Sequence, residues 1–228
     1  NIIVHGCFGS AALFHALAQV FNFHGQQAIC FNYNDRDNLM KSSAELIEAL
    51  ETLSTNMNRQ PITVIGHSQG GLVARKALVK DREPSLQNPD LALHLVTIST
   101  PFAGIAAADH CGSITARILS FGLVIPICKI ISGDKWDQIT QFSPFIKKPG
   151  DLRLQVNTHL KIVTDEAGTC RKYTDDGACA EDDFVFGLDE QYMEPIDNSS
   201  RVQNIEVAAG HVEIVGDYDA PHEKLIAL

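Results

Sequence analysis

The sequence is short of basic residues. It has 18 Lys and Arg against 28 Asp and Glu, which gives a formal net charge of -10 at pH 7. Binding to a nucleic-acid backbone depends on a basic surface that neutralises phosphates, so this balance excludes nucleic acid as the default partner. The acidic residues gather between 165 and 197, where 11 Asp and Glu stand against only Arg171 and Lys172.

Long apolar runs are also missing. The longest candidate, 121–131, contains Pro126 and Lys129 and is much shorter than the roughly 18 apolar residues that a membrane span needs. We therefore expect no transmembrane segment. The chain starts on the strand-like stretch 1–4 without a basic leader or cleavage site, so a signal peptide was removed, is not included or never existed.

The remaining composition is that of a folded domain. Hydrophobic residues make up 45% and charged residues 20%, which excludes a disordered or low-complexity chain, and the 228 residues fit one α/β domain over 1–228.

Six cysteines permit disulfides in an oxidising compartment, although an enzyme of this size can keep them reduced. Cys170 and Cys179, within a stretch rich in Gly and Asp, suit a small disulfide loop and favour a secreted or periplasmic location.

Apolar, β-rich runs alternate with helical patterns along most of the chain. Strands are expected at 2–5, 28–33, 62–65, 93–99, 160–164 and 202–207, and helices at 11–23, 42–57 and 69–80. The second helix is expected to begin with a capping box at Ser42. Such alternation predicts a mostly parallel, doubly wound sheet with functional sites at the carboxyl ends of its strands.

Residues 101–150 break this alternation because they contain no convincing strand and are too long for a plain connection. Apolar residues between 114 and 131 predict a helical lid or cap inserted over the carboxyl end of the strands, where its apolar face would line a pocket for an apolar ligand. Residues 113–148 carry five Lys or Arg against two Asp, so this segment could contact an anionic lipid surface. The alternative is a fixed cap that only completes the core.

The most informative motif is Gly66-His67-Ser68-Gln69-Gly70, between an apolar strand and a helix start. This is the nucleophile-elbow pattern, in which small flanking residues let a serine adopt a strained backbone and project its Oγ from the turn. The helix N-terminus also places the Gln69 N–H to stabilise an oxyanion. The alternative is an ordinary strand-to-helix turn that uses its glycines for packing.

A second oxyanion donor is expected after the first strand, in His5-Gly6-Cys7-Phe8-Gly9. The backbone N–H of Cys7 is the first choice and that of Phe8 the second. The alternative is a glycine-rich turn that binds nothing.

The nine histidines compete for the role of general base. His211 follows the last strand, where a loop can bring an imidazole over the sheet, whereas His67 adjoins the serine on a sharp turn and is expected to be structural. The orienting carboxylate should follow the penultimate strand, between the serine and the histidine in chain order. Asp182 is the first choice, because Val185 three residues later anchors the loop, and Asp183 and Asp165 are rivals.

With these motifs in this order, the chain resembles the α/β-hydrolase fold and, within it, bacterial triacylglycerol lipases and esterases. Ser99–Gly104 is similar to the Thr-Pro-His-x-Gly segment of those lipases, and 141–145 to the Ser-Pro-Phe-Leu segment that closes their lid. The chain departs from the family where Phe102 replaces the usual His and where Asp183 stands in place of a Gly.

The residues and the resemblance together predict a serine carboxylic-ester hydrolase acting on a hydrophobic ester or lipid. Ser68 would attack the carbonyl, His211 would take its proton, Asp182 would orient the imidazole, and the Gln69 and Cys7 amides would hold the oxyanion. The same machinery would serve an acyltransferase or a thioesterase, and a non-catalytic scaffold used for binding is the alternative from another class.

No cofactor is required for this chemistry. Some calcium-binding lipases have an Asp two residues after the catalytic His and a Gln six residues after it. Glu213 and Asp217 stand at those positions here, and the sequence gives calcium no further support.

Overall fold

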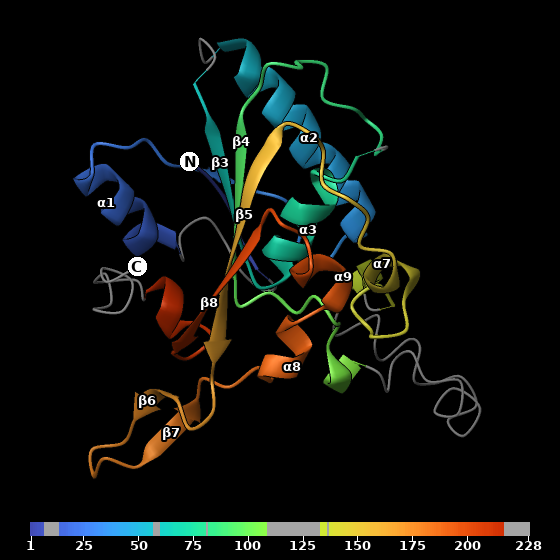
Figure 1. Ribbon diagram of the computed structural model, residues 1–228. Coiled ribbons are helices and arrows are strands. Elements are labelled where there is room, and N and C mark those ends of the chain that lie inside the picture. The colour runs from blue at the N-terminus through green and yellow to red at the C-terminus, as the bar shows by residue number, and fades with distance from the viewer. Residues whose placement is uncertain (7–13, 57–59, 81, 109–132, 136, 217–228) are drawn as a thin grey trace.

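The computed structural model describes residues 1–6, 14–56, 60–80, 82–108, 133–135 and 137–216. Its central sheet has six strands in the order β2-β1-β3-β4-β5-β8, and every pair of neighbours is parallel (Figure 1). The strands are β1 (Ile2–Val4), β2 (Ile29–Phe31), β3 (Ile62–His67), β4 (Leu93–Ile98), β5 (Val156–Asp165) and β8 (Val202–Ala208). The expected parallel sheet is therefore confirmed.

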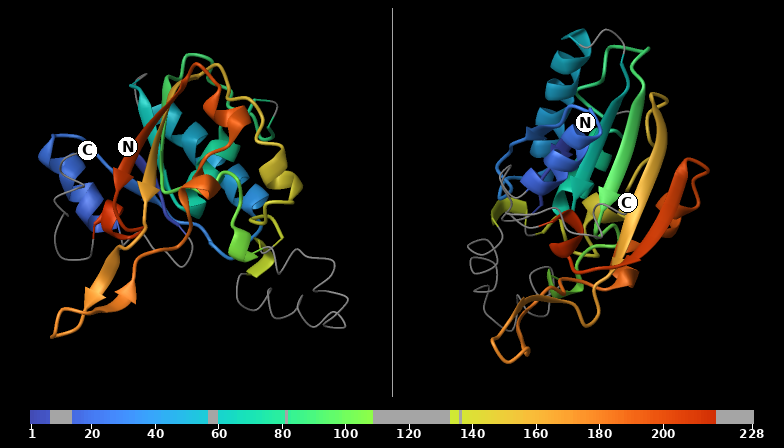
Figure 2. Two further views of the ribbon diagram at one scale, coloured as in Figure 1. Left: turned by 60° about the horizontal axis from the view of Figure 1, so that its bottom comes forward. Right: turned by 90° about the vertical axis from the view of Figure 1, so that its left-hand side faces the viewer.

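Helices cover both faces of this sheet (Figure 2). Alternate residues of a strand point to opposite faces, so Val64 of β3 packs with α2 (Leu39–Asn56) and α3 (Gln69–Ala77), whereas Ile65 packs with α1 (His15–Phe23). Each face thus has its own hydrophobic core, as a doubly wound sheet requires.

Helix α2 begins earlier than the capping-box pattern predicts. The Asn38 side chain accepts a hydrogen bond from the Met40 N–H at 2.8 Å, which satisfies one of the unpaired amides at the helix start. Ser42 lies one turn inside the helix and is buried. The prediction was wrong because a serine in an amphipathic helix can pack as a core residue as well as cap.

The described part of the inserted segment contains short helices, η2 (Ala106–Ala108), η3 (Gly133–Lys135) and α7 (Pro144–Lys147), and no strand. Residues 109–132 and 136 of the predicted lid lie outside the described residues. Ser143 begins α7 by accepting the Ile146 N–H at 3.1 Å.

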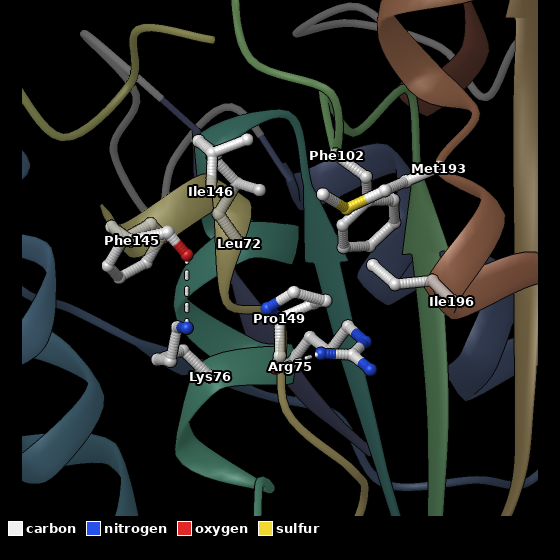
Figure 3. A pocket seen from close by; sticks show the side chains of 9 residues that line it. All are labelled: Leu72, Arg75, Lys76, Phe102, Phe145, Ile146, Pro149, Met193 and Ile196. Atoms are coloured by element: carbon white, nitrogen blue, oxygen red, sulfur yellow. Dashed lines mark hydrogen bonds between the residues drawn. The ribbon is translucent and has the colours of Figure 1, made fainter. Parts of the chain in front are cut away.

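The end of the inserted segment is fixed to α3. Arg75 donates to the carbonyls of Pro149 and Gly150 at 2.6 and 2.8 Å. Lys76 donates to the carbonyl of Phe145 at 3.1 Å (Figure 3). A cavity of ≈ 20 Å³ remains between these groups, which is room for about one water molecule. This contact therefore joins the end of the inserted segment to the packed core.

Beyond β5, the chain forms the antiparallel hairpin β6 (Cys170–Tyr173) and β7 (Cys179–Asp182), which projects past the carboxyl end of the sheet (Figures 1 and 2). A disulfide joins Cys170 to Cys179, as the sequence predicted. The chain then continues through α8 (Leu188–Gln191) and α9 (Glu194–Asp197) to β8 and η4 (Glu213–Val215). Among the described helices, none has the length and apolar character needed to cross a membrane.

Candidate active site

Ser68 occupies the sharp turn between β3 and α3. Its backbone has φ 53° and ψ −127°, a conformation that residues with a side chain rarely adopt. The turn is held by the neighbouring strand, because the Ser68 N–H donates to the carbonyl of Ile98 at 2.8 Å. This is the strained geometry that the nucleophile-elbow pattern predicts.

The glycines around Ser68 are needed for close approach. A Cβ on Gly70 would lie 2.2 Å from the carbonyl oxygen of Val4, and one on Gly66 would lie 2.5 Å from the Cα of Gly71. A Cβ on Gly6 would lie 2.9 Å from the Cβ of Ser68, so the loop after β1 reaches the serine. The predicted oxyanion residues Cys7 and Phe8 lie outside the described residues.

His211 lies in the loop after β8 and is buried. Its Nδ1 is 2.8 Å from Oε1 of Glu166, whose side chain is 0% exposed and which directly follows β5. A carboxylate can only accept, so His211 Nδ1 carries a hydrogen, which leaves Nε2 as the nitrogen that can accept a proton.

Glu166 is surrounded by hydrogen-bond donors. Its Oε1 also accepts from the Thr164 hydroxyl at 3.0 Å, and its Oε2 accepts from the N–H groups of Val185 and Phe186 at 2.7 and 3.2 Å. The Thr164 hydroxyl lies 2.6 Å from that of Ser99 at the end of β4. This network fixes the carboxylate and links the ends of two neighbouring strands.

The structure does not bring Asp182 to His211, which differs from the sequence-based expectation. Asp182 is the exposed last residue of β7, and its Oδ1 accepts the N–H of Phe184 at 3.0 Å. Asp182 is exposed at the base of the hairpin, where it pairs with Cys170, whereas Glu166 directly follows β5 and is buried. The rival Asp165 bonds locally, accepting the Ala167 N–H at 3.2 Å.

The other rival, Asp183, is buried and holds the loop that carries His211. Its carboxylate accepts from the N–H groups of Val212 and Glu213 at 3.1 and 2.9 Å, and its backbone carbonyl accepts the His211 N–H at 2.9 Å. Asp183 therefore contacts the main chain of this loop, and the carboxylate that meets the imidazole comes from Glu166.

Gln69 begins α3 beside Ser68, as predicted. Its buried side chain donates to the carbonyl of Asp35 at 3.0 Å and accepts from Lys135 of η3. These bonds hold the side chain and leave the N–H as the group that the helix start offers to an oxyanion.

The candidate calcium residues do not form a cation site in the described part of the chain. Glu213 accepts the Gly210 N–H at 2.9 Å, and Asp217 lies outside the described residues. No cluster of three His, Cys, Asp or Glu arranged to hold a metal occurs among residues that the structure describes.

Comparisons with known proteins agree with this architecture. A family model described as the alpha/beta hydrolase fold matches residues 2–112. A solved structure of the mature lipase BlEst2 from Bacillus licheniformis is similar with a TM-score of 0.63 and 17% identity, over 94% of this chain and 85% of that chain. The lin2722 product from Listeria innocua is similar with a TM-score of 0.59 and 18% identity, over 99% of this chain and 90% of that chain.

A further similar structure is the phospholipase PlaB from Legionella pneumophila, with a TM-score of 0.51 and 17% identity. The match spans 73% of this chain and 39% of that chain. A search of curated protein sequences finds no match. The parallel sheet, the family model and these structures together show that the chain has the α/β-hydrolase fold and resembles bacterial lipases and esterases.

Proposed function

We propose that this chain hydrolyses carboxylic esters with Ser68 as nucleophile, His211 as general base and Glu166 as the orienting acid. The observation that supports this most directly is the 2.8 Å contact between His211 Nδ1 and the buried carboxylate of Glu166. This contact supports a base of fixed tautomer at the edge of the sheet where the strained turn of Ser68 also lies.

In the proposed reaction, Ser68 Oγ attacks the ester carbonyl while Nε2 of His211 takes the hydroxyl proton. The imidazolium that forms is stabilised by Glu166, and the negative oxygen is held by the Gln69 N–H at the start of α3 together with the N–H of Cys7. His211 then gives its proton to the departing alcohol. Water repeats the sequence on the acyl-enzyme and releases the acid, so no cofactor takes part.

The substrate we propose is a hydrophobic ester or lipid. The similar structures include a lipase and a phospholipase by name, which supports an ester with an acyl chain. The apolar and locally basic character of residues 113–148 supports medium or long chains and transient contact with a lipid interface. The Cys170–Cys179 disulfide supports a secreted or periplasmic location.

The proposal is tested by fluorophosphonate labelling followed by ester assays. Wild type should be labelled and Ser68→Ala should not, and chromogenic esters of increasing chain length should be hydrolysed faster than acetate, more so with micelles present. A folded wild-type protein that is neither labelled nor active on any ester would refute the enzyme. Labelling with acetate preferred and no response to micelles would keep the hydrolase and reject the lipid substrate.

A further inference from the structure

We infer that His67 is a positioning residue that ties the base to the nucleophile through a hydrogen bond from its Nε2 to the backbone carbonyl of His211. This inference rests on the proposed function, because it concerns how the reacting pair is held together. His67 precedes Ser68 in the motif, and the sequence alone indicates only a structural histidine.

The geometry of this contact is direct. His67 Nε2 lies 2.8 Å from the carbonyl oxygen of His211, across 144 residues of sequence. The two rings lie with their centroids 4.8 Å apart, and Phe14 packs edge-on against the His67 ring at 5.7 Å. His67 is buried at this position, so water cannot replace the bond without repacking.

The acceptor fixes the protonation of His67. A carbonyl oxygen cannot donate, so Nε2 must carry a hydrogen. Burial, together with the neighbouring His211, lowers the pKa of His67 to about 3, and the ring is therefore uncharged near pH 7. A neutral donor suits this place, because a second positive charge beside His211 would oppose the imidazolium that forms during catalysis.

The bond completes the support of the catalytic loop. Asp183 accepts the N–H groups of His211 and of the two residues after it, and His67 donates to the carbonyl of His211. Since His67 and Ser68 are joined by one peptide bond, the loop of the base is tied to the same turn that carries the nucleophile. The bond from His67, together with the Asp183 contacts, therefore restricts how far the imidazole of His211 can move relative to Ser68.

Two amide substitutions test this role. The amide nitrogen of Gln occupies nearly the place of Nε2, whereas that of Asn occupies the place of Nδ1 and cannot reach the carbonyl. His67→Asn should lower kcat about 10- to 100-fold with little change in KM, and slow fluorophosphonate labelling by a similar factor. His67→Gln should restore most of both rates.

A third substitution, His67→Phe, keeps a ring without the donor and should resemble His67→Asn. The matched control is His159→Phe. His159 is also buried, and its Nε2 is hydrogen-bonded to the Thr97 hydroxyl at 3.0 Å. Neither residue belongs to the proposed triad. The kcat of this control should stay near that of wild type, whatever happens to its thermal stability.

Thermal unfolding identifies variants that are not folded at the assay temperature, and the Gln and Asn pair decides the question even if the Phe variant fails to fold. Equal kcat in His67→Gln and His67→Asn, or a KM change without a kcat change, would overturn the inference. Absence of labelling in wild type would instead refute the proposed function, so the two failures can be told apart.

Discussion

Replacing Glu166 by Gln should nearly abolish activity by changing the tautomer of His211. The two oxygens of Glu166 face different donors: Oε2 accepts two backbone N–H groups, from Val185 and Phe186, and Oε1 accepts from Thr164 and His211. The backbone donors cannot rotate, so the Gln carbonyl oxygen should stay with them. The new NH₂ group then faces the imidazole.

An amide NH₂ facing Nδ1 turns that nitrogen into an acceptor, which moves the imidazole proton of His211 to Nε2. The base then cannot take the proton of Ser68. In a serine protease, the corresponding change of an acid to its amide reduces kcat about 10⁴-fold, which corresponds to about 5.5 kcal/mol of transition-state stabilisation. We expect a loss of this order for Glu166→Gln, with the fold retained because the replacement conserves shape.

The assay is steady-state hydrolysis of a chromogenic ester, with the rate of fluorophosphonate labelling as a second measure. Asp182→Asn is the control, because Asp182 is exposed and bonded only to its own turn in the described structure, and it should keep kcat within about twofold. If Asp182→Asn were far more damaging than Glu166→Gln, the assignment of the acid to Glu166 would be wrong.

Three further predictions concern stability. Burial, with Arg75 and Lys161 nearby, lowers the pKa of His159 to about 2. Below the unfolded value of about 6.5, the unfolded chain therefore binds a proton that the folded chain does not, and stability is lost as pH falls. In urea titrations, the stability difference between wild type and His159→Gln should shrink by about 2 kcal/mol between pH 7 and pH 5, and an unchanged difference would contradict burial of the neutral ring. Reducing the Cys170–Cys179 disulfide should make the hairpin susceptible to limited proteolysis before the sheet unfolds, and simultaneous loss of both would refute its local role. Gly70→Ala should cost about 3 kcal/mol or more, because the new Cβ would collide with the carbonyls of Val4 and His5, and a wild-type unfolding midpoint would show that the turn can move.

Sequence patterns predicted the features that depend on local chemistry. The apolar, β-rich runs that alternate with helical patterns predicted the six strands of the main sheet, and the glycines around Ser68 predicted the strained turn. Strands β6 and β7 gave no such signal, because seven of their eight residues are exposed and neither face needs to be apolar.

The acid could not be chosen from local pattern alone. Glu166 and Asp183 lie 17 residues apart in the sequence, yet both reach the loop of His211, because the hairpin between them starts and ends beside the sheet. The rule that the acid follows the penultimate strand pointed to the end of β5, where Glu166 stands. The family-like Asp-Asp-Phe-Val segment favoured Asp182 instead, and only the folded backbone shows which carboxylate meets the imidazole.

The hairpin of β6 and β7 is attached to the rest of the fold over a very short stretch. The Asp183 N–H donates to the carbonyl of Thr169 at 3.4 Å, so the chain leaves and returns at nearly one point, and at the far tip a Cβ on Gly177 would meet nothing within 4 Å. We therefore expect the segment between these points to tolerate substitution, insertion or fusion to another protein while Glu166 and Asp183 keep their places. The hairpin is thus a separate structural unit beside the proposed active site, and changes in it should alter the surroundings of a bound ester without moving the proposed triad.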